Sequence, residues 1–267
     1  MIVPIDLSPI ALTLGDFPLR WYALTAIAAI ALTILIVRRG AIRAGLPVEL
    51  VEDAAIWVGA ASLIGGRALY LVQNELPELA MHPLHAFAIW HGGLSFYGGL
   101  IAGLVALSLW ARRRGLSFGL VADLAAPAVA AGQAVGHVGC LIGGDSYGLP
   151  TNGPLAIVYR NAGAMAPQGI PLHPTQLYEA LALGILAVAL WSVRGRMTAI
   201  GPGTLAAVYL LGNAVIRFAL FFLRDDVVVF GGLKVAQLIA VAIAFGAVAW
   251  LVTILRPAAQ PRLAEAR

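Results

Sequence analysis

A set of charged and aromatic side chains recurs near one end of the apolar stretches of this sequence. Its members are Arg20, Tyr22, Arg67, Tyr97, His137, Asp145, His173, Glu179, Arg217 and Arg224. Ionisable groups in or beside an apolar span are costly to bury, so by default they are paired or line a hydrated, functional site. We therefore predict that these side chains converge on one cavity. For Arg20 and Glu179 the alternative is a place at the membrane interface, where long side chains extend towards water.

Arg217 lies deep within an apolar stretch, several residues from its nearest predicted end. A guanidinium at that depth costs about 3 kcal/mol unless it is paired or hydrated. Its planar fork of donors suits phosphate oxygens better than the point charge of a lysine would. We predict an anionic lipid headgroup as its partner, with a structural ion pair as the alternative.

The segment 136–151 is rich in glycine, and we predict a tight loop that leaves the preceding span. Such glycines serve either close approach of the backbone to a ligand or turn geometry alone. The single cysteine, Cys140, lies in this segment and is interpreted as a small buried thiol, with a nucleophile as the alternative. His173 precedes Pro174, and proline marks the first turn of a helix. We expect His173 at the mouth of the cavity, with an interfacial hydrogen-bonding role as the alternative.

The elements that position these residues follow from the composition. Hydrophobic residues make up 61% of the 267 positions and charged residues only 11%, with a mean hydropathy of +0.90. This balance excludes a soluble globular domain and indicates an integral membrane protein. The net charge of +4 comes largely from arginines in short clusters between apolar runs, so nucleic acid is not a predicted partner. One cysteine and five scattered histidines predict no metal site, and no cofactor is predicted.

Windows long enough to cross a bilayer as helices occur seven times. They cover residues 17–37, 54–73, 96–111, 118–135, 174–193, 203–223 and 235–255. Strand signals are scarce, so the predicted fold is all-α, with seven transmembrane helices in a single polytopic membrane domain over residues 1–267. The glycines at 65–66 and 98–99 are interpreted as helix-packing positions.

The basic clusters set the orientation of these spans. They contain Arg38, Arg39 and Arg43; Arg112, Arg113 and Arg114; Arg194 and Arg196; and Arg256, Arg262 and Arg267. Threading seven spans through them puts every cluster on one side, which the positive-inside rule makes cytoplasmic. We thus predict an amino terminus outside, a carboxyl terminus inside, and outer loops at 74–95 and 136–173.

Four motifs are specific enough to compare with known families. They are Leu19-Arg20-Trp21-Tyr22, the stretch 92–101 with Ser95-Phe96-Tyr97-Gly98-Gly99, the glycine segment 136–148, and His173-Pro174-Thr175-Gln176-Leu177-Tyr178-Glu179. In this order the sequence resembles the prolipoprotein diacylglyceryl transferase family of the bacterial cytoplasmic, or inner, membrane. The resemblance implies transfer of the diacylglyceryl group of phosphatidylglycerol to the lipobox cysteine of a prolipoprotein signal peptide, with release of glycerol phosphate.

The resemblance also implies a substrate-binding set. Its members are Arg217, Arg20, Tyr22, His173, Gln176, Glu179, Arg224, Gly139 and Gly148. Two other functional classes stay open. One is a membrane enzyme that uses the same lipid with a different acceptor or modifies its headgroup, and the other is a non-catalytic lipid-binding protein or transporter.

The sequence departs from the family pattern at several positions of this site. In the glycine segment, His137 stands where the family has arginine, Cys140 where it has asparagine and Asp145 where it has glutamate. Tyr97 stands where the family commonly has histidine, and Phe221 where an acid is often found. Because a thiol must lose its proton to attack carbon, we predict His137 as the base, with Tyr97 as a weaker candidate and Asp145 orienting a neighbour. For Tyr97 the alternative is an interfacial aromatic anchor.

Overall fold

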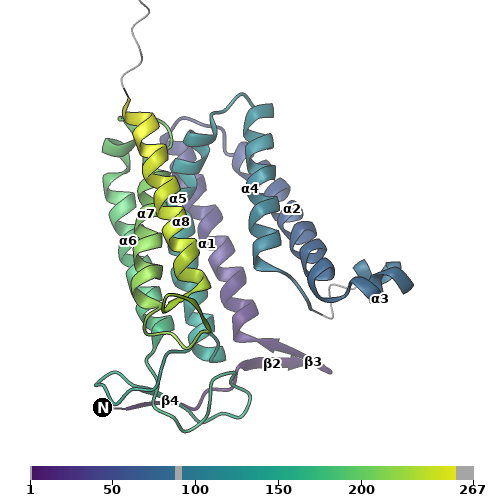
Figure 1. Cartoon of the computed structure of the whole chain (residues 1–267). Coiled ribbons are helices and arrows are strands. Elements are labelled where there is room, and N and C mark those ends of the chain that lie inside the picture. Colours follow the sequence, from purple (N-terminus) through teal and green to yellow (C-terminus); the bar gives the residue numbers. More distant parts are fainter. Residues whose placement is uncertain (1, 88–91, 257–267) are drawn as a thin grey trace, which may run out of the picture. The chain divides into compact units, whose positions relative to one another are not determined.

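The computed structural model describes residues 2–87 and 92–256, and within them the chain is dominated by helices (Figure 1). The helices are α1 (Trp21–Arg43), α2 (Glu49–Asn74), α3 (Leu76–Met81), α4 (Phe96–Arg113), α5 (Phe118–Gly143), α6 (Thr175–Thr198), α7 (Thr204–Leu220) and α8 (Val235–Leu255), with a 3-10 turn η1 at Pro83–Phe87. The predicted basic residues Arg262 and Arg267, and part of the predicted loop 74–95, lie outside the described residues.

Five of these helices are long and apolar enough to cross a membrane: α1, α2, α5, α6 and α8. Helix α7 is apolar but shorter, with 17 residues. The prediction of a helical membrane protein is therefore confirmed. Each of the seven predicted windows coincides with one helix of the described chain, because length and apolarity suffice to locate such segments.

Two predicted boundaries are wrong. Residues 17–20 belong to strand β3 (Phe17–Arg20), which pairs antiparallel with β2 (Ile10–Leu14), so the first long helix begins only at Trp21. The glycine segment is not a loop from residue 136 onwards, because α5 continues through Gly136 and Gly139 to Gly143. In an apolar environment a helix satisfies every backbone hydrogen bond internally, and this outweighs the low helix propensity of glycine.

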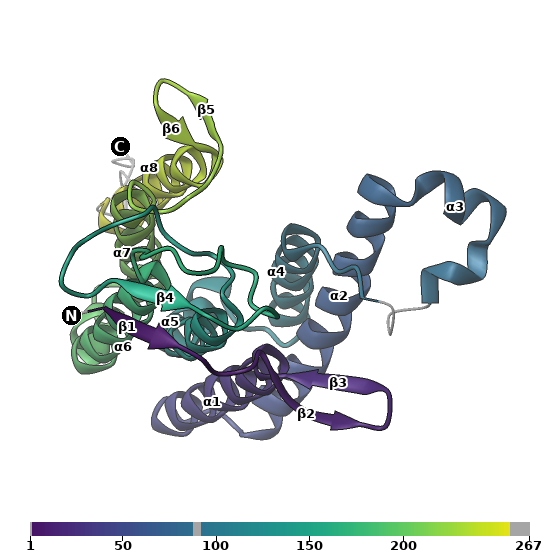
Figure 2. The ribbon, with the colours of Figure 1, turned by 90° about the horizontal axis from the view of Figure 1, so that it is seen from below.

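The chain divides into two compact units, of which the first contains residues 1–33 and 125–267. Beyond one end of its helices, strand β1 (Val3–Ile5) pairs in parallel with β4 (Ile157–Tyr159), as Figure 2 shows. A hairpin of β5 (Val228–Phe230) and β6 (Leu233–Lys234) joins α7 to α8. The all-α prediction did not include these short strands, which lie before α1 and in the connections between later helices of this unit.

A small core that includes residues of β4 holds this strand to the end of α5. Ile157, Tyr159, Ala166 and Leu172 are buried together, and the hydroxyl of Tyr159 donates a hydrogen bond of 2.7 Å to the carbonyl oxygen of Leu141. Burial raises the pKa of the Tyr159 phenol above its usual value, and the carboxylate of Asp145 acts in the same direction. The phenol is therefore a neutral hydrogen-bond donor.

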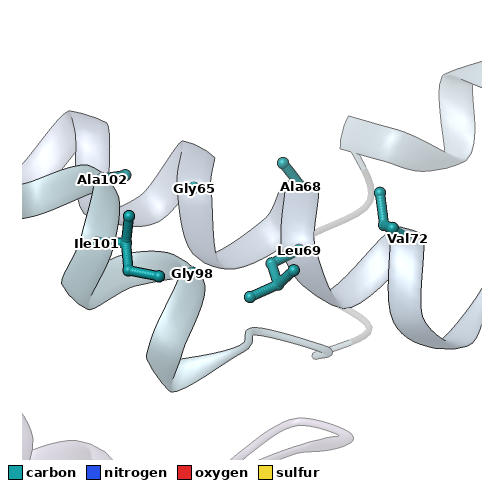
Figure 3. Close-up of a pocket in the computed structure, with 7 residues that line it drawn as sticks. All are labelled: Gly65, Ala68, Leu69, Val72, Gly98, Ile101 and Ala102. Carbon is teal, nitrogen blue, oxygen red and sulfur yellow. The ribbon is translucent and has the colours of Figure 1, made fainter. Parts of the chain in front are cut away.

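The second unit, residues 34–124, is built on the close pairing of α2 and α4. A Cβ added at Gly65 would lie 2.7 Å from the carbonyl oxygen of Gly98, so only glycine permits this approach. The interpretation of these glycines as packing positions agrees with this geometry. An apolar pocket lies beside the crossing, and Figure 3 shows its lining of Gly65, Ala68, Leu69, Val72, Gly98, Ile101 and Ala102.

Arg67 of α2 is buried, and its guanidinium holds the connection between α2 and α4. It donates hydrogen bonds to the backbone carbonyl oxygens of His85, Ala86, Gly92 and Gly93, at 2.8 to 3.2 Å. The carboxylate of Glu75 lies 3.8 Å from the guanidinium. These contacts give Arg67 a structural role in its own unit.

Candidate functional site

A cluster of ionisable side chains lies in the first unit, where α5 and α6 meet the segment after α7. The Nε2 atom of His137 is 2.9 Å from a carboxylate oxygen of Glu179, and the other carboxylate oxygen is 3.9 Å from the guanidinium of Arg224. Only 3% of the Glu179 side chain is exposed. A carboxylate so deeply buried needs cationic or hydrogen-bonding partners, and this one has an imidazole on one side and a guanidinium on the other.

The first turn of α6 explains how Glu179 reaches this place. Pro174 is the residue before the helix, and the two residues after it bind the loop that follows α5. The hydroxyl of Thr175 donates to the carbonyl oxygen of Ser146 at 2.8 Å, and the amide of Gln176 donates to that of Asp145 at 2.6 Å. Glu179 follows Gln176 by three residues and so lies on the same face of the helix.

Arg224 is held from several sides. Its guanidinium donates to the hydroxyl of Ser146 at 2.8 Å and lies 2.9 Å from a carboxylate oxygen of Asp226. Its backbone carbonyl accepts a hydrogen bond from the ammonium of Lys234, which also donates to the carbonyl oxygen of Phe221 at 2.6 Å. Lys234 thereby satisfies backbone groups just beyond the end of α7.

Arg217 projects from the last turn of α7 and is half-buried. Among the described residues no carboxylate lies within 4.0 Å of its guanidinium, which instead stacks on the ring of Phe221 at 5.4 Å. Arg224 stacks on the same ring at 4.7 Å. Phe221 therefore contacts two guanidinium groups without neutralising either one. Because Arg224 is paired with Glu179 and Asp226, the positive charge left available for an anion within the described residues is that of Arg217.

The other predicted residues lie outside the contacts of this cluster. Arg20 ends strand β3 and is exposed, and Tyr22 is in the first turn of α1. His173 precedes α6, and its ring lies 6.3 Å from that of Tyr178. Its Nδ1 atom is buried and has no hydrogen-bond partner among the described residues. Asp145 lies in the loop after α5, but the carboxylate that contacts His137 is that of Glu179. Tyr97 belongs to α4 in the second unit, where its ring packs edge-on against Phe96.

The two glycines of the predicted binding set occupy tight packing positions. A Cβ at Gly139 would lie 3.2 Å from the Cα atom of Tyr22, so this glycine lets α5 approach α1. A Cβ at Gly148 would lie 2.6 Å from the carbonyl oxygen of His173 and 2.8 Å from that of Leu223. Gly148 thus stands where three backbone segments of the site meet.

Sequence reasoning missed two groups of polar residues near the site. Lys234, the single lysine of the sequence, and Gln237 hold the end of α7 from the start of α8. Gln133 of α5 accepts hydrogen bonds of 3.0 Å from both Tyr209 and Asn213 of α7. The available signal was the presence of amide side chains inside apolar windows, where polar groups require partners.

Fold and site together define a helical membrane protein with a buried carboxylate and two arginines gathered at one end of its helices. Comparison with known proteins specifies this class further, because the sequence matches the family model of prolipoprotein diacylglyceryl transferase over residues 9–253. The chain belongs to this family of transferases, which confirms the resemblance seen in its motifs.

Individual relatives span nearly the whole chain. A phosphatidylglycerol–prolipoprotein diacylglyceryl transferase of Nitratidesulfovibrio vulgaris is 34% identical over 264 residues, which are 95% of this chain and 96% of that protein. A protein of the same name from Gloeobacter violaceus is 36% identical over 253 residues, covering 91% and 93% of the two chains. A third, from Methylococcus capsulatus, is 33% identical over 253 residues, covering 91% and 94%.

Proposed function

We propose that this protein transfers the diacylglyceryl group of phosphatidylglycerol to the lipobox cysteine of prolipoproteins, as the names of its relatives state for them. The observation that carries the proposal is the arrangement of Arg217 and Arg224 on the ring of Phe221, next to the pair of His137 and Glu179. Such an arrangement offers the charge of Arg217 to a phosphodiester and a proton acceptor to a thiol at the same end of the membrane helices, while Arg224 stays paired with Glu179 and Asp226.

The proposed reaction forms one bond and breaks one. The thiol gives its proton to the imidazole of His137, and the resulting thiolate attacks the glyceryl carbon that carries the phosphate. The carbon–oxygen bond to phosphate breaks, and its electron pair leaves with glycerol phosphate. Because the leaving phosphate gains negative charge, the guanidinium of Arg217 stabilises it as the bond breaks.

Glu179 and Arg224 position these groups. The carboxylate of Glu179 fixes the orientation of the imidazole and stabilises it once it carries the proton. Arg224, held by Ser146 and Asp226, fixes Glu179 from its other side. Tyr97 is the alternative proton acceptor by its residue type, and Asp145 orients a neighbouring group.

The remaining predicted binding residues receive proposed roles according to their positions. Arg20, Tyr22 and His173 contact the lipid headgroup or the signal peptide, and Gln176 orders the loop at Asp145. Gly139 and Gly148 shape the site by close packing.

We further propose that the chain is a single polytopic domain of the bacterial inner membrane with seven spans, an outer amino terminus and a cytoplasmic carboxyl terminus. Two features support it. The family match runs continuously through both compact units, and α4 and α7 coincide with predicted spans. Cysteine-accessibility labelling tests the orientation: residues in 144–173 should react from outside, and a reporter fused after Arg267 should be cytoplasmic. Labelling of that loop from the cytoplasm alone would contradict it.

The activity is tested by incubating the purified protein in phosphatidylglycerol vesicles with a lipobox peptide. The mass of the peptide is then measured by mass spectrometry. The expected product carries one diacylglyceryl group on its cysteine, and a peptide with serine in that place is the control. Consumption of phosphatidylglycerol with no change in peptide mass would indicate another acceptor. Binding of the lipid without its consumption would indicate a non-catalytic protein.

A further inference from the structure

Three polar side chains that the proposed reaction does not use lie within the apolar helices of the first unit. The Oε1 atom of Gln133 accepts hydrogen bonds of 3.0 Å from the hydroxyl of Tyr209 and from the side-chain amide of Asn213. All three residues are only half-buried, although they belong to apolar helices. Partly exposed polar groups at membrane depth are unfavourable unless the exposed side meets a polar partner.

The cluster lies one helical turn deeper than Arg217 and His137, the phosphate-binding group and the base proposed above. On α7, Asn213 precedes Arg217 by four residues, and on α5, Gln133 precedes His137 by four. Residues four apart share one face of a helix and are separated by about 5 to 6 Å. Both helices run towards the end that carries His137 and Arg217, so Gln133 and Asn213 are farther from that end.

One hydrogen-bonding group that this cluster leaves free within the described residues is a donor, the Nε2 of Gln133. Two donors meet at Oε1 of Gln133, which fixes the amide so that its Nε2 points away from Tyr209 and Asn213. Within the described residues, Nε2 of Gln133 donates to no protein acceptor. Its ligand must therefore offer an acceptor, and an ester carbonyl is a group that accepts and cannot donate.

We propose that the Gln133 amide, held in place by Tyr209 and Asn213, binds an ester carbonyl of the diacylglyceryl group. This inference rests on the proposed function, which places the lipid phosphate at Arg217. In a glycerophospholipid the ester carbonyls lie deeper in the bilayer than the phosphate, just as Gln133 lies deeper than Arg217. The site therefore recognises the acyl ester as well as the headgroup.

A competition between two lipids tests this recognition. Vesicles contain equal amounts of diester phosphatidylglycerol and its dialkyl ether analogue with chains of the same length, and the two peptide products are separated by mass. The ether lipid keeps the phosphate and the reacting carbon but lacks carbonyl groups. The wild type should favour the ester by roughly 3- to 10-fold, the effect of one hydrogen bond. Gln133→Met should bring this ratio close to one.

The product ratio does not depend on how much of the variant is folded, because both lipids compete for the same molecules. Tyr209→Phe is the second variant. It keeps the Gln133 amide but removes one bond that orients it, so an intermediate ratio is expected. Ser192→Ala is the matched control, since Ser192 on α6 bonds only the carbonyl oxygen of Ala189 and should leave the ratio at the wild-type value.

The outcomes separate the two proposals. An unchanged preference in both Gln133→Met and Tyr209→Phe, or a wild type that uses both lipids equally, would overturn the ester site and leave the transfer reaction standing. Should Gln133→Met fail to fold, the ratio for Tyr209→Phe decides alone. Absence of product from either lipid with the wild type would contradict the transfer reaction, and the ester site with it.

Discussion

The imidazole of His137 and the carboxylate of Glu179 are joined at 2.9 Å across two different helices, α5 and α6. An arginine at this position would offer only charge, because its guanidinium does not release a proton under ordinary conditions. The histidine can accept a proton instead. The carboxylate beside it fixes the orientation of the imidazole ring.

His137→Gln should therefore lower the rate of peptide modification by about 10²-fold or more, the usual effect of removing a general base. Glu179→Gln should also be impaired, because the amide keeps the shape but not the charge. The measurement is the initial rate of product formation with phosphatidylglycerol and a lipobox peptide. If His137→Arg is as active as the wild type, the position binds phosphate and another group removes the proton.

Arg217→Ala should abolish turnover while the protein still inserts into the membrane, since the lipid phosphate loses its cation. Arg217→Lys should recover only part of the rate, because the ammonium lacks the planar fork of donors. Rates are compared at equal amounts of membrane-inserted protein. Full activity in both variants would assign Arg217 a structural role.

Gly148→Ala should lower the melting temperature of the detergent-solubilised protein. Its new Cβ would meet the backbone oxygens of His173 and Leu223, which cannot move independently, and overpacking of this kind costs about 1 to 3 kcal/mol. Gly136→Ala is the matched control, because a Cβ there has no neighbour within 4 Å and alanine is the better helix former. Equal melting temperatures for Gly148→Ala and the wild type would show that the junction is not tightly packed.

Tyr159→Phe should reduce the free energy of unfolding by about 1 kcal/mol, because the carbonyl oxygen of Leu141 loses its hydrogen bond. The raised pKa of this phenol adds a pH dependence. An unfolded tyrosine ionises near pH 10, so the contribution of Tyr159 is complete below about pH 10 and is lost as the pH rises above it. The stability difference between the two proteins should therefore shrink in alkali. A constant difference would mean that the phenol is not buried in solution.

The helices were predictable because membrane segments obey two strong constraints, length and apolarity, which a single sequence displays. Helix ends were harder to predict. The glycines of α5 indicate a loop when read by propensity alone, yet Gly139 belongs to a helix because it packs against Tyr22 of α1. Contacts between distant residues decide such cases, and a local pattern does not contain them.

The sequence names the candidate residues of the site but does not show how they pair. His137, Glu179 and Arg224 were all expected to be functional, but nothing in their spacing shows that Glu179 contacts both of the others. The role of Phe221 was likewise hidden, because a phenylalanine in an apolar run resembles any core residue. Only the geometry places its ring against two guanidinium groups.

The burial of Lys234 has a practical consequence. Since the sequence contains no other lysine, a protease that cleaves only after lysine has a single target bond, at the junction between β6 and α8. The ammonium there is enclosed by the carbonyl oxygens of Phe221 and Arg224. The folded chain should resist such a protease. Cleavage into two fragments would therefore indicate that α8 has detached from the end of α7.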